Sequence, residues 1–363
     1  MYPSLEEVKK IAASGEYRRI PVCRELYADS YTPVEVLRTL RGSSRHCYLL
    51  ESASQTESWG RYSFLGCHPT LELNLTDGEL TIRRTAEARI GAKTQEAEAG
   101  KTDATDASET VEVRKVTHPG EALREILKDY KSPVLEGLPP FTGGLVGYFS
   151  SDDIEIAGAS PETLVKLEDG HLSTFPLAGT RPRGRTKEED RELEEGLLKD
   201  EKELAEHNML VDLGRNDIGK ISEFGTVKVE KYMSIQRFSH VMHIGSTVKG
   251  TIRKGLDAID AVDSILPAGT LSGAPKIRAC EIINELENNK RGIYGGAIGY
   301  LDFTGNLDTC IAIRIAYKKN GKVFVRSGAG TVADSVPQKE YQECINKAKA
   351  VMNALATAQG GID

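Results

Sequence analysis

Two segments of the sequence carry pairs of glutamates three residues apart. Glu203 and Glu206 lie in EKELAEHNMLVDLGRNDIG (201–219), and Glu340 and Glu343 lie in SVPQKEYQE (335–343). Positions i and i+3 share one face of an α-helix, so each pair can direct two carboxylates at one point. One such pair alone usually belongs to a solvated helix face. Two pairs of oxygen ligands make a site for a hard cation, magnesium above all, a reasonable hypothesis.

A candidate anion site lies in the last hundred residues, where the segment 309–317 alternates like a β-strand. The alternation predicts one buried face and an opposite face of small residues around Arg314. A guanidinium in such a space could bind an anion, although an arginine on an exposed sheet face is the alternative. The first face consists of Ile311, Ile313, Ile315 and Tyr317, and the second of Cys310, Ala312, Arg314 and Ala316.

Two glycine-containing segments could also approach a ligand. Residues 328–333 (GAGTVA) match the spacing of a dinucleotide-binding turn, but Ser335, Pro337 and Gln338 mark a helix start beyond the glycines. These glycines are instead expected to let backbone amides approach a ligand. The segment 272–275 (SGAP) precedes another predicted helix, whose N-terminus could hold a carboxylate or phosphate. It lacks the Gly-Lys-Ser/Thr ending of a P-loop.

The elements that must position these residues predict an α+β fold of layered antiparallel sheets with outer helices. Residues 46–83 contain four short apolar runs separated by turn residues, which is typical of antiparallel strands. Residues 84–117 have few large apolar groups and are expected to form a mobile surface insertion. A short helix is expected at 119–130 and a buried strand at 141–149. Hairpins are expected at Asp169-Gly170 and Asn320-Gly321.

Composition excludes several classes of protein. The 363 residues are 39% hydrophobic and 28% charged, which is enough for a large core in one or two domains. A net charge of −7, with basic and acidic residues interleaved, argues against non-specific nucleic-acid binding. No apolar run is long enough for a membrane span, and the N-terminus has no signal-peptide pattern. The six cysteines form no CxxC pair, so a cytoplasmic protein with reduced thiols is expected.

A series of longer motifs then carries a resemblance to a family. In order, these are PLAGTRPRG, DEKELAEHNMLVDLGRND, SHVMH, GTLSGAPK, YGGAIGY, LDTCIAIR and SGAGTVADSVPQKEYQE. They resemble the C-terminal half of the large subunit of anthranilate synthase, a chorismate-utilising enzyme, and the similarity extends over 150–362. LLES at 49–52 and FTGGLVGYF at 141–149 are similar to the N-terminal half of that family.

The resemblance implies a role for each candidate residue in a chorismate site. Glu203, Glu206, Glu340 and Glu343 would surround Mg²⁺, which would hold the ring carboxylate of chorismate. Tyr294, Arg314, Gly328, Ala329 and Gly330 would hold the enolpyruvyl carboxylate, with Gly179, Thr180, Thr270 and Lys347 close by. Glu162 would protonate the departing C4 hydroxyl, and His243 would assist the elimination of pyruvate. Glu51, Ser52, Ile298 and Tyr300 would belong to a tryptophan feedback site.

The same resemblance separates the alternatives. Ala178 stands where a common type of aminodeoxychorismate synthase has a nucleophilic lysine, so ammonia itself is the expected nucleophile. The sequence contains no glutamine amidotransferase segment, so a separate small subunit would supply ammonia from glutamine. Isochorismate synthase is a further alternative, against which GTLSGAPK and LLES argue. The non-enzymatic alternative is a remnant of such an enzyme that binds a ligand or a partner without turnover.

One departure from the family concerns the middle of the chain. In the family, a block the size of a small domain separates GGLVGYFS from the segment that leads into SDDIEIAGASPE, whereas here GYFSSDD joins them directly. An internal deletion after Phe149 is therefore expected. The predicted division is an N-terminal regulatory-type region, 1–149, and a catalytic region, 150–363. Loss of core strands is expected to expose sheet edges and apolar surface, and so to weaken stability and feedback.

Overall fold

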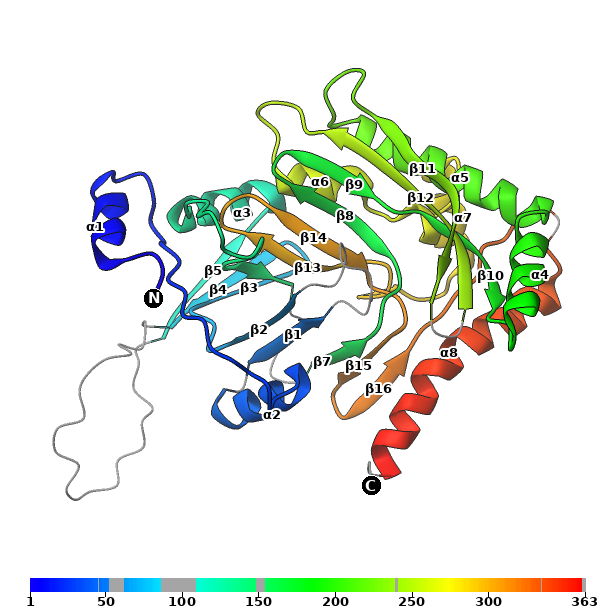
Figure 1. Ribbon diagram of the computed structural model, residues 1–363, viewed down its shortest axis with the longest axis horizontal. Coiled ribbons are helices and arrows are strands. Elements are labelled where there is room, and N and C mark those ends of the chain that lie inside the picture. Colours follow the sequence, from blue (N-terminus) through cyan, green and yellow to red (C-terminus); the bar gives the residue numbers. More distant parts are fainter. Residues whose placement is uncertain are drawn as a thin grey trace. The chain divides into compact units, whose positions relative to one another are not determined.

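The computed structural model describes residues 1–44, 46–51, 62–85, 109–147, 154–238, 241–333 and 335–360 (Figure 1). The chain divides into two compact units, Met1–Pro139 and Pro140–Asp363. The boundary falls ten residues before the division expected after 149, because the strand β6 (Gly144–Val146) pairs with a strand of the second unit.

The first unit combines helices with two small antiparallel sheets. The apolar runs of 46–83 form the predicted strands: β1 (Cys47–Glu51) pairs with β2 (Ser63–Cys67), and β3 (Leu71–Thr76) pairs with β4 (Glu79–Arg84). Leu80 and Ile82 of β4 pack against Ala122 and Ile126 of α3 (Pro119–Leu127). The other elements are α1 (Leu5–Ala13), α2 (Pro33–Ser43) and the 3₁₀ turn η1 (Lys128–Tyr130).

The predicted insertion at 84–117 is corrected at its C-terminal end. Residues 86–108 lie outside the described residues, but Thr110–Lys115 forms the strand β5, which pairs with β4 along its whole length. The alternation of Val111 and Val113 with charged residues is a strand pattern, and the Thr- and Glu-rich composition concealed it.

The second unit is built on an eight-stranded antiparallel sheet (Figure 1). Seven of its strands follow the order β10-β12-β9-β8-β14-β13-β6, and the eighth, β11, pairs with β12. The hairpin between β8 (Thr163–Glu168) and β9 (His171–Thr174) turns at Asp169 and Gly170, both with positive φ, as predicted. The remaining strands of this sheet are β10 (Leu177–Pro182), β11 (Lys228–Arg237), β12 (Val241–Thr251), β13 (Ala297–Asp302) and β14 (Leu307–Ile311).

A second sheet in this unit has the order β16-β15-β7. Its strands are β7 (Glu155–Gly158), β15 (Ile315–Lys319) and β16 (Lys322–Val325), and Asn320-Gly321 forms the predicted turn between the last two. The predicted continuous strand at 309–317 is wrong, because the chain leaves the large sheet after Ile311 and enters this sheet at Ile315.

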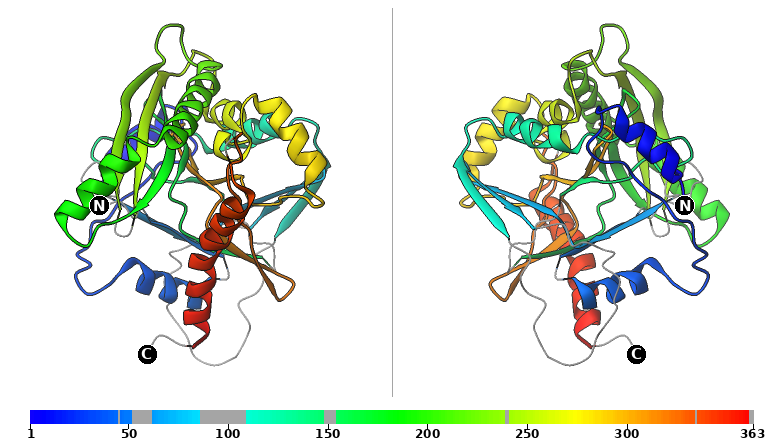
Figure 2. Two further views of the ribbon diagram at one scale, coloured as in Figure 1. Left: turned by 90° about the vertical axis from the view of Figure 1, so that its right-hand side faces the viewer. Right: turned by 90° about the vertical axis from the view of Figure 1, so that its left-hand side faces the viewer.

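Helices cover the large sheet, and the hydrophobic core contains side chains of both the helices and the strands. The charged segment 201–219 is the predicted helix, α5 (Glu201–Gly219), whose N-terminus is capped by Asp200. It runs along β10 and β12 (Figure 2), with Leu210 and Leu213 packed against Ala178. The other helices are α4 (Lys187–Leu197), α6 (Ala258–Ile265), the 3₁₀ turn η2 (Gly269–Leu271), α7 (Lys276–Leu286) and α8 (Pro337–Gly360).

The junction expected at 150–153 lies outside the described residues. The strands on either side of it belong to different sheets: β6 pairs with β13, and β7 pairs with β15. The two flanking strands therefore do not pair with each other. Among the described helices, none is both long and apolar enough to cross a membrane.

Candidate active site

The site begins with a buried carboxyl group. Glu162, just before β8, has 7% of its surface exposed, and the Thr270 hydroxyl of η2 donates to its Oε1 at 2.5 Å. Burial raises the pKa of Glu162 to about 7, although the Thr270 hydrogen bond and the charges of Arg314 and Lys347 oppose this shift. A carboxyl group with this pKa can exist as an acid or as a base near neutral pH.

Arg314 lies at the break between the two sheets. Its φ is +52°, in the left-handed region that residues other than glycine rarely adopt. Its carbonyl oxygen accepts a hydrogen bond from the backbone N–H of Ala159 at 3.2 Å. The expected ligand face is corrected here, because Ala312 and Ala316 are as buried as Ile311 and Ile315. The strained backbone at Arg314 replaces simple alternation, and such strain is typical of functional sites.

His243 of β12 is held in one tautomer. Its Nδ1 is 2.9 Å from the carbonyl oxygen of Gly179 and 3.1 Å from Oγ1 of Thr180. A carbonyl oxygen can only accept, so Nδ1 carries the proton and Nε2 presents a lone pair. Burial lowers the pKa of His243, and the charges of Arg314 and Lys347 lower it further. The ring is therefore neutral near pH 7.

The carboxylate pair of α5 is partly buried. Burial raises the pKa of Glu203, and the charges of Glu206 and Asp200 raise it further. Burial also raises the pKa of Glu206; Lys202 opposes this, and the charge of Glu343 adds to it. His207, the next residue along the helix, points into the core instead, where its Nε2 is 2.6 Å from Oγ of Ser246.

The second pair, on α8, lies within electrostatic range of the first. Lys202 Nζ is 3.1 Å from Oε1 of Glu340, and Lys347 Nζ is 2.6 Å from Oε1 of Glu343. Burial of Glu340 would raise its pKa, but hydrogen bonds from Lys202 and Ser335 outweigh that effect, so its pKa is lowered.

These carboxylates fit magnesium in kind, because all are hard oxygen donors that repel one another without a cation. In the described part of the chain, no group of three or more His, Cys, Asp or Glu side chains is close enough to hold a metal ion as the side chains stand. Lysines balance part of the negative charge there: the positive charges of Lys202 and Lys347 both oppose the raised pKa of Glu206.

A glycine-rich loop adjoins both the carboxylates and an aromatic side chain. A Cβ on Gly330 would lie 3.0 Å from Oε1 of Glu206, and a Cβ on Gly328 would lie 3.2 Å from the Tyr294 hydroxyl. Lys347 donates to the Gly328 carbonyl at 3.3 Å. The helix α8 begins at Pro337, seven residues after Gly330, so the glycines do not open a helix as a dinucleotide-binding turn requires. Ala329 lies between them in the same loop.

The residues assigned to tryptophan binding are divided between the two units. Glu51 ends β1 and is exposed, while Ser52 lies outside the described residues. Ile298 and Tyr300 are on β13, where the Tyr300 ring is 4.3 Å from that of Phe141 between centroids. The regulatory assignment stays a prediction.

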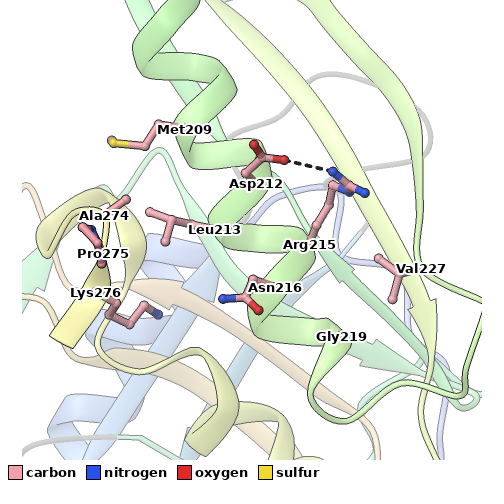
Figure 3. A pocket seen from close by; sticks show the side chains of 10 residues that line it. All are labelled: Met209, Asp212, Leu213, Arg215, Asn216, Gly219, Val227, Ala274, Pro275 and Lys276. Atoms are coloured by element: carbon pink, nitrogen blue, oxygen red, sulfur yellow. Dashed lines mark hydrogen bonds and ion pairs between the residues drawn. The ribbon is translucent and has the colours of Figure 1, made fainter.

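None of the candidate site residues described above lines a groove of about 880 Å³ (Figure 3). It runs between the C-terminal half of α5 and the start of α7, where Arg215 pairs with Asp212 at 2.9 Å. The predicted anion site at 272–275 borders it through Ala274 and Pro275, and Lys276, which also lines the groove, pairs with Asp217. A cavity of about 30 Å³, in contrast, is lined by Glu162 and Thr270.

Sequence reasoning missed the ionic partners that hold the site together. Lys202 precedes the first glutamate pair directly, and a lysine beside an acidic pair is a local signal that could have indicated charge compensation. Glu287, Arg291 and Arg326 form an ion-pair network beside Tyr294. The spacing of Glu287 and Arg291 fits an i,i+4 pair, but Arg326 is 39 positions from Glu287 and no motif marks it.

Comparison with known proteins finds relatives over nearly the whole chain. The family described as chorismate binding enzyme matches residues 142–353. Anthranilate synthase component 1 of Acetivibrio thermocellus is 36% identical over 514 residues, covering 98% of this chain and 99% of that protein. The same protein from Aquifex aeolicus (strain VF5) is 58% identical over 212 residues, covering 58% of this chain and 43% of the relative. The crystal structure of anthranilate synthase component I from Streptococcus pneumoniae TIGR4 matches with 34% identity and a TM-score of 0.52, covering 96% of this chain.

The chain is shorter than the proteins it resembles. It spans 66% of the Streptococcus structure and less than half of the Aquifex relative. The Acetivibrio alignment extends over 514 positions against 363 residues here, so more than a hundred positions of that relative have no counterpart. This agrees with the loss of an internal block. With its matched region, its fold and its relatives taken together, the chain belongs to the family of chorismate binding enzymes, and its similarity to anthranilate synthase component 1 extends through 98% of its residues.

Proposed function

We propose that this chain is the large subunit of an anthranilate synthase, converting chorismate and ammonia to anthranilate, pyruvate and water. Chorismate carries two carboxylates, a ring hydroxyl and an enolpyruvyl ether, so the site must bind a dianion, supply one proton to a leaving hydroxyl and release pyruvate. In this proposal the enzyme works in the cytoplasm in tryptophan biosynthesis. A glutamine amidotransferase subunit would supply the ammonia.

The observation that carries the proposal is Glu162, a buried acid facing two cations. With a pKa of about 7, it is protonated in a large share of molecules at neutral pH. It can therefore donate its proton to the C4 hydroxyl, which leaves as water. The charges of Arg314 and Lys347 lower the pKa of both Glu162 and His243, so each of these two groups lies within electrostatic range of both cations.

Two groups of residues would hold the two carboxylates of the substrate. Arg314, Tyr294 and the amides of the loop 328–330 offer donors for the enolpyruvyl carboxylate. The four glutamates, Glu203, Glu206, Glu340 and Glu343, would hold Mg²⁺, with Glu340 and Glu343 exchanging their lysine partners for the ion. The ion would supply positive charge to the ring carboxylate.

His243 is placed to handle the second proton. Because its Nδ1 proton is directed to the Gly179 carbonyl, its Nε2 lone pair is the free basic atom of the ring. A neutral imidazole of this kind can accept a ring proton as the ring C–O bond breaks, and the released enolpyruvate takes up a proton at its methylene carbon from solvent to become pyruvate.

Other members of the family use related chemistry. Ala178 is a buried alanine packed against Leu210 and Leu213, so this position offers no amine nucleophile of the aminodeoxychorismate synthase type. Isochorismate formation is disfavoured because the relatives compared above bear the name anthranilate synthase component 1. A binding remnant without turnover is the remaining alternative, since the relatives are longer than this chain.

The test is an anthranilate fluorescence assay on the purified chain with chorismate, Mg²⁺ and ammonium at pH 7 to 8. We expect anthranilate and pyruvate in equal amounts, with no activity on glutamine unless a partner subunit is added. Glu162→Gln should abolish turnover while retaining chorismate binding by calorimetry. Binding by the unsubstituted chain without turnover would support the remnant, and absence of both would refute the proposed function.

A further inference from the structure

A single carboxylate behind the candidate site joins two arginines. Glu287 caps the C-terminus of α7 and accepts hydrogen bonds from both Arg291 and Arg326. The pairing with Arg291 uses Nε and Nη2, with the closest contact at 2.7 Å, and Arg326 Nη2 donates at 2.6 Å. About 30% of each of these three side chains is exposed, so solvent screens the pairs only in part.

The first arginine reaches the segment that carries the partner of the catalytic acid. Arg291 Nη1 donates to the carbonyl of Leu271 at 2.5 Å. Leu271 follows Thr270 in the 3₁₀ turn η2, and Thr270 donates to Glu162. The guanidinium therefore fixes the peptide next to the hydroxyl whose hydrogen bond lowers the pKa of Glu162.

The second arginine reaches the segment that would bind the enolpyruvyl carboxylate. The guanidinium carbon of Arg326 lies 5.8 Å from the centroid of the Tyr294 ring, within range of a cation–π contact. Arg326 is also the first residue after β16 and stands two positions before Gly328, whose own position abuts the Tyr294 hydroxyl. Its Nη1 is fixed by the side chain of Asn289 at 2.9 Å.

We infer that Glu287 is a positioning residue for this active site, acting through two separable contacts: Arg291 positions Thr270, and Arg326 positions Tyr294 and the glycine loop. This inference rests on the proposed function for its catalytic meaning, but the two contacts are properties of the fold. Neither arginine touches the reacting atoms. Their role is to keep the proton donor and the carboxylate site in register, where small displacements have large effects on rate.

The two contacts predict different consequences for two variants. The Thr270 hydrogen bond lowers the pKa of Glu162 in the unsubstituted chain. Arg291→Met should loosen η2 and weaken this bond, so the titration midpoint of Glu162 should rise by at least half a pH unit. Arg326→Met should leave that midpoint unchanged and weaken chorismate binding about tenfold. Glu287→Gln should produce both effects. Glu285→Gln is the matched control, because Glu285 lies on the same helix and pairs with Arg278.

The first measurement requires no substrate. Protein labelled with ¹³C at glutamate carboxyls is titrated by NMR, and the Glu162 resonance is assigned by its loss in Glu162→Gln. Arg314 and Lys347, the cations that lower the pKa of Glu162, are unchanged in every variant. Arg291→Lys keeps the positive charge but loses the planar two-sided contact, so it should also raise the midpoint, and it replaces the Met variant if that variant does not fold.

The second measurement is calorimetry of chorismate binding with Mg²⁺. The inference is overturned if Glu287→Gln moves the Glu162 midpoint by less than half a pH unit and leaves the chorismate affinity within twofold of the unsubstituted chain. It is also overturned if all variants shift both quantities together with their melting temperatures, since a purely structural ion pair would do so. If the unsubstituted chain does not bind chorismate, the proposed function fails, while the NMR titration still decides whether Glu287 positions Thr270.

Discussion

Replacing Thr270 by valine tests whether Glu162 is the proton donor. The substitution keeps the shape of the side chain and removes the hydroxyl that donates to Oε1 of Glu162 at 2.5 Å. A hydrogen bond to a charged carboxylate in a buried site contributes about 1.5–3 kcal/mol, which corresponds to roughly one to two pKa units. Because the bond stabilises the ionised form, its loss should raise the pKa of Glu162 from about 7 to roughly 8 or 9.

The direction of the effect on rate is unusual for the loss of an active-site contact. At pH 8, about one tenth of the Glu162 carboxyls of the unsubstituted chain would be protonated, and roughly three quarters would be for a pKa near 8.5. The alkaline limb of the kcat/KM profile should therefore move upward by about one to two pH units in Thr270→Val, even if the maximal rate falls. The assay is anthranilate fluorescence from pH 6 to 10, with ammonia held constant as the free base.

The pH dependence of the free energy of unfolding tests the same pKa of Glu162 without a measurement of turnover. Glu162 has a folded-state pKa of about 7, above the ordinary value of 4.5, so its contribution to stability is complete below pH 4.5 and is lost as the pH rises through 7. The size of this loss is roughly 3 kcal/mol. It should be absent in Glu162→Gln and should extend to higher pH in Thr270→Val, as measured by urea unfolding.

The control is Thr309→Val, because Thr309 is buried and its hydroxyl donates to the Val165 carbonyl at 2.9 Å, away from Glu162. It should lower stability without moving the alkaline limb. If the limb of Thr270→Val stays at the pH found for the unsubstituted chain, Glu162 is not the group that limits the reaction at high pH.

Four further outcomes are expected. Gly179→Ala should lower the free energy of unfolding by about 1–2 kcal/mol, because Gly179 has φ +67° and an added Cβ would lie 2.9 Å from Leu197. The control Gly196→Ala, in open space within α4, should stabilise the protein slightly, and equal urea midpoints for the two variants would contradict this prediction. Glu206→Gln should raise the Mg²⁺ concentration needed for half-maximal activity at least tenfold, and an unchanged Mg²⁺ dependence would remove Glu206 from the metal site. Tryptophan should inhibit weakly or not at all, so tight binding in calorimetry would show that the feedback site is intact. Ile277, 79% exposed on α7, should promote self-association, which Ile277→Glu should reduce in light scattering without lowering the melting temperature.

Local signals were sufficient for the parts of the site that lie within one element. The cap Asp200 and the helix start at Pro337 are encoded by neighbouring residues, so α5 and α8 and the spacing of their glutamates could be foreseen. The turn at Asn320-Gly321 was equally predictable, because few other residues adopt positive φ at two successive positions.

The features that periodicity missed depend on contacts between distant segments. Ile311, Ile313 and Ile315 continue the alternation of a strand through Arg314, and nothing in their types indicates that the chain changes sheets there. The break is imposed by tertiary pairing, with Ile315 opposite Gly158. The same applies to Glu162 and Thr270, which are 108 positions apart and were placed in one site only by resemblance.

The strands that flank the junction show what the shortened chain lacks. In the order of strands that the structure describes, β6 is the last strand of the eight-stranded sheet and β7 is the last strand of the three-stranded sheet. Both ends of the junction therefore lie at edges, where no strand among the described residues pairs with the second side of the backbone. A block inserted between β6 and β7 would enter and leave the fold at these two edges, and its strands could extend either sheet without displacing a pairing present here. The absence of that block thus leaves the pairings around Glu162 and Arg314 in place while exposing two templates for association, which is why catalytic geometry and a tendency to aggregate are expected in the same molecule.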